Sequence, residues 1–315
     1  MTPPDPTSPA PQRKRWRTVD GIVLLDKPQG LTSTQALQRV RRLLQAEKAG
    51  HAGTLDPMAT GMLPLCFGQA TKACGALLGQ RKAYRATVRL GAATDTGDAD
   101  GQVVEQRPVP AFDTPRLAAV LGALGGERLQ VPPMYSALKR DGRPLYELAR
   151  RGETVEREGR PVRIDTLECL GATEHELEIE VACSKGTYVR VLAEEIAAGL
   201  GTLGHLTSLR RLWVEPFAAD RMVTLEQMEA EAAAGVASPE WLLPVDCAFP
   251  TLPAVTLDAT QTLHLRQGRA LEVSVDLSAG PVLRAYDPAG AFLGLVEIGA
   301  DACLRVQRLF VSGAG

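Results

Sequence analysis

The sequence predicts an α+β region followed by a small, mostly β domain. Before residue 250, strand-like and helix-like segments are mixed without the strict β-α alternation of a doubly wound sheet. After Pro250, short β-prone runs are separated by turn signals, which is typical of a small β domain. The chain has 315 residues, which is enough for two domains of ordinary size. We therefore expect a larger domain over residues 19–248 and a smaller one over residues 249–315.

The first part of the chain predicts a disordered tail. Residues 1–12 contain five prolines and no periodic pattern. A basic cluster follows at residues 13–17. We expect this Pro-rich and basic tail to extend to residue 18.

Three segments precede the middle of the larger domain. Residues 21–25 are a short apolar run, which predicts a buried strand, and residues 26–30 end it as a turn. Ser33 or Thr34 can cap a helix that continues to about Gln45, because the apolar positions in between follow helical spacing. Residues 51–68 are rich in glycine and proline with little periodicity, which predicts a loop of small residues.

The remaining elements follow from periodicity. Strands are expected at 84–90, 161–170 and 176–183, and helices at 115–124, 188–200 and 224–234. In the C-terminal part, β-prone runs lie at 255–257, 282–286, 292–296 and 304–306.

Composition and motifs exclude several classes of protein. No segment contains 18 uncharged apolar residues and the N-terminus has no secretory pattern, so we expect a cytoplasmic protein without a membrane span. The six cysteines form no C-x-x-C pair and have no zinc-ligand spacing with a histidine, which favours buried thiols in a reducing cytoplasm. Phosphate-loop, dinucleotide and hydrolase motifs are missing. The acidic turn at 95–101 resembles a calcium loop, but Arg107 occupies the position that requires a glutamate.

The charge pattern allows nucleic-acid binding without requiring it. The net charge is −2, but residues 128–163 hold nine basic and five acidic side chains, whereas residues 220–240 hold one basic and five acidic. A surface with separated signs can hold a phosphate backbone. Such patches also occur on proteins that bind no nucleic acid.

Asp56 is a candidate catalytic carboxylate within residues 51–68. Taken alone, Asp56-Pro57 indicates a structural turn. The residues around it are small, however, so a large planar substrate could approach the carboxylate closely. Both interpretations stay open on this evidence.

Two tyrosines lie beside basic residues. Tyr84 is flanked by Lys82 and Arg85, and Tyr188 is near Lys185 and Arg190. This placement suits base stacking combined with phosphate contact, but core tyrosines would have the same pattern. Tyr188 and Arg190 share a face if they end a strand and diverge if they begin a helix.

Taken together, these segments closely resemble the TruB-type tRNA pseudouridine synthases, which act on uridine 55 of the T-loop. The matching motifs recur in family order over about residues 20 to 230. They are LLDKPQGLTS (24–33), GHAGTLDP (50–57), GMLP (61–64), YR (84–85) with LG (90–91), PPMYSALK (132–139), CSKGTYVR (183–190) and LRRL (209–212). The C-terminal segment is more weakly similar to the PUA-like domain of bacterial members.

The resemblance implies a pseudouridine synthase catalytic domain over 19–248, with an active cleft across a central antiparallel sheet. Asp56 would be the catalytic aspartate, Tyr84 would stack on the target base, and Arg190 would pair with the Asp56 carboxylate.

The resemblance also implies how the RNA is held. His51, Tyr188 and Leu209 match family positions that contact the substrate. Residues 128–163 correspond to a mobile segment that closes on the tRNA arm, and residues 249–315 to a PUA-like RNA-binding domain.

The reaction needs few groups. It breaks the N1–C1′ bond of uridine, rotates the uracil and joins C5 to C1′, so we expect no metal or organic cofactor. An ionised carboxylate can act as nucleophile or base, and an arginine favours that ionised form. The base must be flipped out of the folded T-loop, and His51 could fill the space that it leaves. The atom that Asp56 attacks stays open.

Two other functions remain as alternatives. The chain could be a tRNA-binding or tRNA-folding protein whose main role is not catalytic. It could also be a pseudouridylase that needs guide RNA and protein partners, as archaeal and eukaryotic relatives do. The bacterial-type C-terminal segment and the lack of long Lys-rich tails favour an enzyme that acts on tRNA without a guide RNA or protein partner. We expect a monomer as the default, since no sequence pattern indicates a larger assembly.

Overall fold

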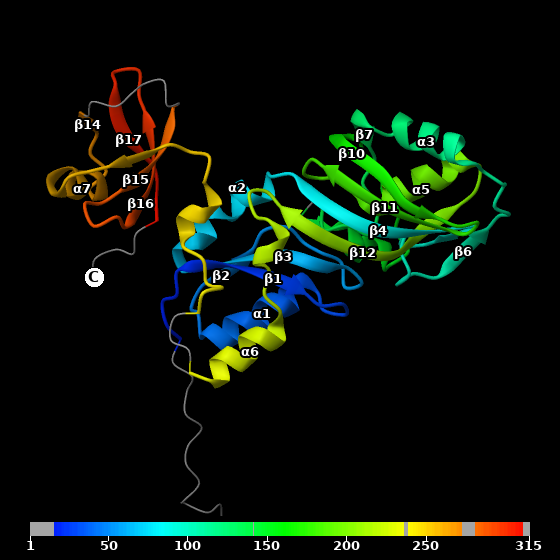
Figure 1. The fold of residues 1–315 in the computed structure, drawn as a ribbon, viewed down its shortest axis with the longest axis horizontal. Helices are drawn as coiled ribbons and strands as arrows, with labels where there is room; N and C mark the ends of the chain where they lie inside the picture. Colours follow the sequence, from blue (N-terminus) through cyan, green and yellow to red (C-terminus); the bar gives the residue numbers. More distant parts are fainter. Residues whose placement is uncertain (1–15, 141, 236–238, 273–280, 311–315) are drawn as a thin grey trace, which may run out of the picture.

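The computed structural model describes residues 16–140, 142–235, 239–272 and 281–310. Within them the chain forms a large mixed region built on an eight-stranded sheet and a smaller C-terminal region built on a five-stranded sheet (Figure 1). The predicted α+β class is confirmed.

The eight-stranded sheet has the order β1-β3-β12-β4-β11-β10-β7, and β2 pairs with β3. Its pairs are antiparallel except β12 with β3, which run parallel. The strands are β1 (Gly21–Lys27), β2 (Ala49–His51), β3 (Thr60–Phe67), β4 (Lys82–Leu90), β7 (Gly126–Gln130), β10 (Arg160–Ala172), β11 (Glu176–Cys183) and β12 (Gly204–Val214). The central strands β3, β12 and β4 form the framework beneath the site described below.

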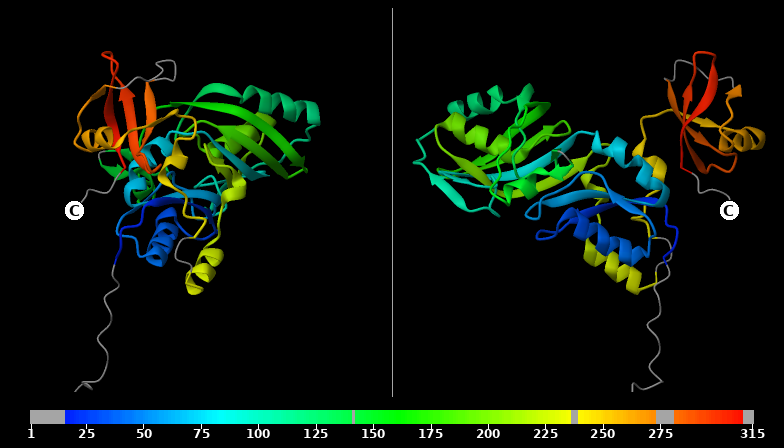
Figure 2. Two further views of the ribbon diagram at one scale, coloured as in Figure 1. Left: turned by 60° about the vertical axis from the view of Figure 1, so that its left-hand side comes forward. Right: turned by 180° about the vertical axis from the view of Figure 1, so that it is seen from behind.

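Helices pack against this sheet in two groups. Helices α1 (Ser33–Leu44) and α6 (Leu225–Ala233) lie together near β1 and β3, and α3 (Thr114–Ala123) and α5 (Val189–Leu200) lie together near β10 and β4 (Figures 1 and 2). Each group turns its apolar stripe toward one continuous core. The two groups therefore fix opposite ends of the sheet, and the central strands lie between them.

Shorter elements connect these parts. They are the 3-10 helix η1 (Gly68–Ala73) with α2 (Cys74–Leu78), the hairpin of β5 (Ala92–Thr94) and β6 (Val103–Gln106), the hairpin of β8 (Lys139–Arg140) and β9 (Arg143–Pro144) with α4 (Leu145–Ala149), and the 3-10 helices η2 (Ala219–Arg221) and η3 (Val245–Ala248).

The C-terminal sheet has the order β13-β15-β16-β17-β14 and is covered by helix α7. Its elements are β13 (Ala254–Thr256), α7 (Ala259–Arg266), β14 (Leu271–Glu272), β15 (Val282–Tyr286), β16 (Phe292–Ile298) and β17 (Cys303–Leu309). Phe310 packs against Phe249 and Phe292, with ring centroids 5.7 and 5.4 Å apart, in an apolar cluster that also contains Ile22 and Leu24 of β1. The two sheets are therefore joined by apolar contact as well as by the chain.

Most predicted elements are confirmed, with bounds shifted by one to a few residues. This holds for β1, β4, β10, β11, α1, α3, α5 and α6, and for the four C-terminal strands. Strand β12 and helix α7 were not predicted.

Two predictions are wrong. Residues 51–68 are not simply a loop, because they contain β3. That strand lies between β1 and β12 and is buried on both faces, so it lacks the alternation of a half-exposed strand. The cap of α1 is Thr32, not Ser33 or Thr34: its side chain accepts from Gln35 N, and the Gln35 side chain accepts from Thr32 N.

The predicted disordered tail lies outside the described residues as far as residue 15. The end of this tail differs from the prediction, because Arg17 N donates to Gln45 O (2.7 Å) and Arg17 O accepts from Glu47 N (3.0 Å). The guanidinium of Arg41 also stacks on the Trp16 ring, 4.6 Å from its centroid. These contacts fix residues 16–18 against the end of α1.

None of the described helices is long and apolar enough to cross a membrane.

Candidate active site

Asp56 lies in a short loop between β2 and β3, and hydrogen bonds from other elements fix the backbone of this loop. The Ser33 hydroxyl accepts from Leu55 N (2.8 Å) and donates to Leu55 O (3.1 Å), and Leu55 is itself buried. The Lys27 ammonium donates to Pro57 O at 3.4 Å. The chain on both sides of Asp56 is therefore fixed, and the Asp56 side chain stays partly exposed.

Arg190 joins Asp56 to a second carboxylate. Its Nη2 lies 3.1 Å from Asp56 Oδ2, and its Nη1 lies 3.6 Å from Asp98 Oδ2. The same two nitrogens donate to Thr96 O (2.8 Å) and Tyr135 O (2.6 Å). The guanidinium is 6% exposed, so these four partners fix its position and its charge is shielded little by water.

The structure shows whether Tyr188 and Arg190 end a strand or begin a helix. Tyr188 is the extended residue before α5 and Arg190 is the second residue of that helix. Gln130 of β7 fixes the residue that precedes α5, because its side chain accepts from Tyr188 N (2.8 Å) and donates to Tyr188 O (3.2 Å). The beginning of the helix thus directs Arg190 to Asp56.

Burial raises the pKa of Asp56, and the adjacent Arg190 opposes this rise. The negative charges of Asp98 and Asp100 raise it further, while Lys27 lowers it. The ionised form of Asp56 therefore depends on its cationic neighbours, and first on Arg190.

Tyr84 lies on β4, near enough to Asp56 for the charge of that carboxylate to affect the pKa of the Tyr84 phenol. Tyr84 is 8% exposed, and burial raises the pKa of its phenol, so the hydroxyl stays protonated at neutral pH. Tyr84 is paired with Arg211 of β12, and Leu209 is paired with Ala86 two residues along. Because residues two apart on a strand share a face, Leu209 and Tyr84 lie on the same side of the sheet.

His51 ends β2, five residues before Asp56. Burial and the Arg211 charge lower the pKa of His51, so its imidazole is neutral at pH 7. Its Nδ1 is buried and has no hydrogen-bond partner among the described residues. The ring is therefore held by packing and can leave its position without breaking a hydrogen bond at that nitrogen.

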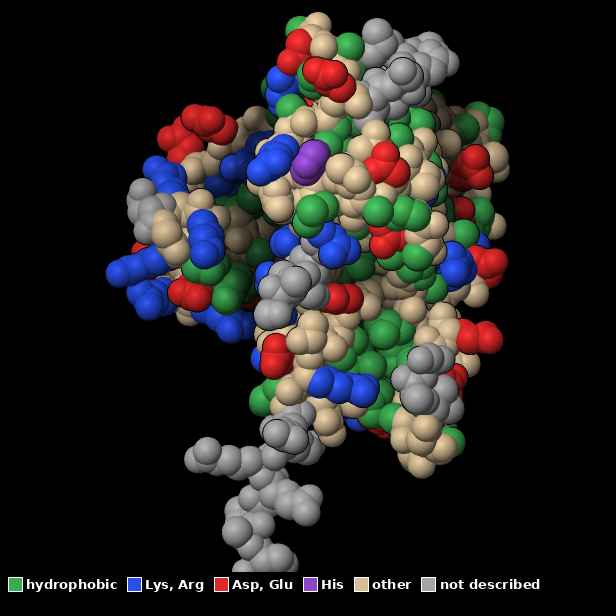
Figure 3. Space-filling view, turned by 90° about the vertical axis from the view of Figure 1, so that its left-hand side faces the viewer, with side chains coloured by type: hydrophobic (Ala, Val, Ile, Leu, Met, Phe, Trp, Pro, Cys, Tyr) green, Lys and Arg blue, Asp and Glu red, His purple; other side chains and the backbone are tan. Residues whose placement is uncertain are grey.

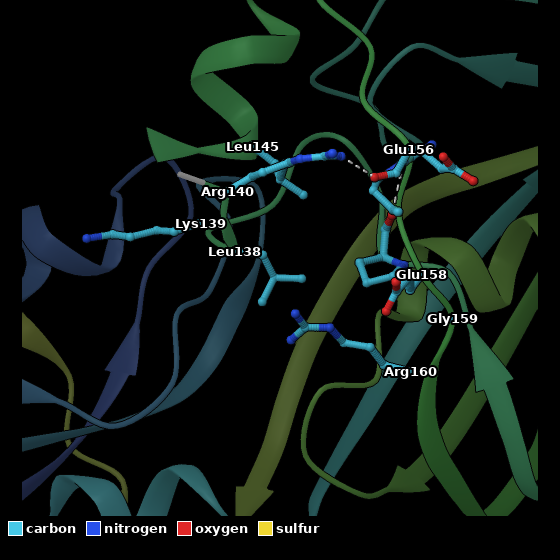
Figure 4. A pocket seen from close by; sticks show the side chains of 10 residues that line it. Leu138, Lys139, Arg140, Leu145, Glu156, Glu158, Gly159 and Arg160 are labelled. Atoms are coloured by element: carbon cyan, nitrogen blue, oxygen red, sulfur yellow. Dashed lines mark hydrogen bonds between the residues drawn. The ribbon is translucent and has the colours of Figure 1, made fainter. Parts of the chain in front are cut away.

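A basic cavity opens between residues 132–145 and 156–160. It has a volume of about 390 Å³ and is lined by Leu138, Leu145, Lys139, Arg140 and Arg160, among others (Figure 4). Arg140 Nη1 donates to Glu156 O (2.7 Å) and closes one side. Arg160 is near enough to Tyr188 to lower the pKa of its phenol, although burial dominates and raises it. Arg160 therefore both lines this cavity and acts electrostatically on Tyr188.

Cationic side chains also gather where the C-terminal sheet meets η1 (Figure 3). The Lys72 ammonium donates to Leu309 O (2.7 Å), and Arg308 Nη1 donates to Lys72 O (3.2 Å). Burial and then the neighbouring Lys48 and Arg308 lower the pKa of Lys72. Lys48 directly precedes β2, so this cationic junction is continuous with the strand that ends at His51.

Three residues of the site were missed from the sequence. Asp98 lies in the acidic turn that was considered only for calcium, and Lys27 and Arg211 are almost fully buried cations. Nothing in the local pattern marks Asp98 as the second partner of Arg190, because 92 residues separate them. Among the described residues, no cluster of His, Cys, Asp or Glu has the arrangement of a metal site.

Comparison with known proteins places this geometry in a family. Residues 41–189 match the model of the TruB family pseudouridylate synthase N-terminal domain. Residues 190–249 match the tRNA pseudouridylate synthase B C-terminal domain, and residues 253–310 match the C-terminal model of pseudouridine synthase II TruB. The chain is 52% identical to a tRNA pseudouridine synthase B of Aromatoleum aromaticum over 94% of each chain. The chain belongs to the TruB family.

Other TruB relatives are similar over nearly their full length. The chain is 50% identical to a tRNA pseudouridine synthase B of Chromohalobacter salexigens, covering 95% of this chain and 96% of that protein. It is 48% identical to one of Burkholderia mallei, covering 98% and 99%.

Among solved structures, a Cbf5-Nop10-Gar1 complex contains a similar chain, with a TM-score of 0.69 and 23% identity over 92% of this chain and 85% of that one. This likeness concerns the fold. It extends over both sheets, in agreement with the predicted architecture.

Proposed function

We propose that this TruB family member converts uridine 55 in the T-loop of tRNA to pseudouridine, with Asp56 as the catalytic carboxylate. The observation that carries the proposal is the Asp56–Arg190 pair of 3.1 Å: Asp56 lies in the loop that follows His51 and is near enough to Tyr84 for the Asp56 charge to affect the pKa of its phenol. The curated relatives, all named tRNA pseudouridine synthase B, support tRNA as the substrate.

The isomerisation exchanges one bond for another. The N1–C1′ bond breaks and the C5–C1′ bond forms; C5 loses its proton and N1 gains one, so nothing is oxidised and nothing is consumed. Asp56 must be ionised to act as nucleophile or base, and Arg190 maintains and orients that charge. The buried phenol of Tyr84 offers its ring for stacking on the flipped uracil.

Flipping the base out of the T-loop removes its stacking energy, so contacts with the enzyme must offset that loss. Unstacking costs a few kcal/mol, and one aromatic stack returns about 1–3 kcal/mol. The unpartnered Nδ1 of His51 supports a role in which the imidazole enters the space that the base leaves. Tyr188 and Leu209 would then bound the pocket of the flipped base.

The RNA would be held by three regions. We assign residues 19–248 to the catalytic domain, residues 128–163 to a segment that closes on the T-arm, and residues 249–315 to a PUA-like RNA-binding domain. The basic cavity beside Arg160 and the cationic junction at Lys72 support these assignments, because both present positive charge toward a phosphate backbone.

We infer that the enzyme acts in the cytoplasm as a monomer, without guide RNA or protein partner. All six cysteines are unpaired, as expected in a reducing compartment. The catalytic pair, the stacking ring and the basic surfaces come from one chain, so no partner is needed to complete the site.

Replacing Asp56 by Asn tests the proposal. Asn keeps the size of the side chain and removes its charge, so turnover should be abolished while the Kd for tRNA changes less than about three-fold. Release of tritium from tRNA labelled at uridine C5 reports turnover, and filter binding reports Kd. Asp258→Asn is the matched control, because Asp258 caps α7 in the C-terminal region and Asn is an equally good cap. Appreciable tritium release by Asp56→Asn would refute the assignment.

A further inference from the structure

Arg211 is an almost completely buried cation in the centre of the large sheet. It is 1% exposed and is the largest fully buried side chain of the described residues. It forms no ion pair with any described carboxylate. Burying a cation without a paired carboxylate is energetically costly, so the hydrogen bonds of the guanidinium must offset part of that cost.

The guanidinium bridges the sheet and the catalytic loop. Nε donates to Met62 O of β3 (2.6 Å), and Nη2 donates to Gly53 O (3.1 Å), three residues before Asp56. Gly53 has φ +99°, and a Cβ at this position would lie 3.3 Å from Arg211 Nη1. Glycine thus allows the loop to lie directly on the guanidinium.

The same guanidinium is linked to Tyr84. The two residues are paired across β12 and β4, so their side chains lie on the same face of the sheet. Burial raises the pKa of the Tyr84 phenol, and the Arg211 charge opposes this rise. Tyr84 is also the ring that we propose stacks on the uracil, so the guanidinium lies beside the phenol that would meet the base. One planar donor group therefore reaches both the loop that carries Asp56 and the stacking ring.

We propose that Arg211 is a positioning residue of the active site: it sets the gap between Asp56 and Tyr84 into which the uracil must fit, by holding the Gly53 carbonyl while its guanidinium lies against the Tyr84 side chain. This inference rests on the proposed function. Lysine cannot replace arginine here, since one ammonium lacks the rigid fork that reaches separate acceptors in one plane.

The test uses Arg211→Lys, with Arg210→Lys as the control on the same strand. Arg210 is 41% exposed and forms a bidentate pair with Asp26. Under single-turnover conditions with saturating tRNA, Arg211→Lys should be about 10- to 100-fold slower with Kd changed less than two-fold. Arg210→Lys should keep the wild-type rate within two-fold. A wild-type rate for Arg211→Lys would overturn the inference.

A double-mutant cycle separates positioning from a general structural role. In the Tyr84→Phe background the hydroxyl is already lost, so Arg211→Lys should slow the reaction by a much smaller factor than in the wild type. Equal factors in both backgrounds would refute the link. If Arg211→Lys does not fold, Tyr84→Phe alone decides: we expect at least a ten-fold slower rate with unchanged Kd, and a wild-type rate overturns the inference. Failure of the wild-type protein to form pseudouridine would instead refute the proposed function.

Discussion

Replacing Arg190 by Gln removes the charge that faces Asp56 and keeps a side chain of similar length. The wild-type pair joins a nearly buried guanidinium to a carboxylate that is 37% exposed, at 3.1 Å. A hydrogen bond between charged groups contributes about 1.5–3 kcal/mol. Because water reaches Asp56, we take the lower part of this range, about 1.5–2 kcal/mol. This corresponds to a loss of roughly 10- to 30-fold in kcat/KM at neutral pH.

The defect should depend on pH in one direction. Arg190 holds the pKa of Asp56 down against burial, so the substitution raises that pKa. The ionised carboxylate is then lost at a higher pH than in the wild type as the solution is acidified. The loss of activity should therefore be largest at acidic pH and become smaller as pH rises.

The assay is single-turnover tritium release from C5-labelled tRNA between pH 5 and 9, at a temperature where both proteins are folded by circular dichroism. Arg89→Gln is the matched control: Arg89 pairs with Glu176 at the same distance of 3.1 Å and lies outside residues 128–163, but it is not a partner of Asp56. A loss for Arg190→Gln that is equal at every pH, or a wild-type profile, would refute the electrostatic role of Arg190.

Three further predictions follow from the same geometry. Asp98→Asn removes a negative charge that raises the pKa of Asp56, so the acid limb of kcat/KM should move to lower pH; a limb that moves to higher pH would contradict this. Tyr84→Phe should bind tRNA with wild-type Kd because it keeps the ring, whereas Tyr84→Ala should bind about 5- to 150-fold more weakly, as loss of about 1–3 kcal/mol of stacking implies; equal Kd values would argue against stacking. Phe310→Ala should lower the free energy of unfolding by about 3–5 kcal/mol, measured by urea denaturation, because this buried ring joins the C-terminal sheet to the rest; a loss below about 1 kcal/mol would show that the junction is not packed as described.

The sequence predicts elements whose pattern is local. Strands β4 and β11 alternate between buried and less buried positions, and α1 carries one apolar stripe, so each is visible from spacing alone. Strand β3 is buried on both faces and contains a proline, so its pattern resembles a loop. These residues form a strand because they pair with β1 and β12, which lie far from β3 in the chain.

The residues of the site likewise fall into two groups, those that a sequence motif indicates and those that only the fold brings together. Asp56, Tyr84 and Arg190 were predicted because motif order pointed to them. Asp98 and Arg211 were not, because their importance lies in partners that only the fold supplies: Asp98 reaches Arg190 across the start of α5, and Arg211 reaches Gly53 through the sheet. No spacing rule connects residues that are 92 or 158 positions apart.

We propose that a single chain, with Asp56 as its catalytic carboxylate, isomerises a T-loop uridine of tRNA. The most direct test is mass-spectrometric mapping of pseudouridine in unmodified tRNA that has been incubated with the purified protein alone. We expect one pseudouridine, at position 55, with the wild-type protein and none with Asp56→Asn. Unmodified tRNA after incubation with the wild type, or the same modification with Asp56→Asn, would contradict it.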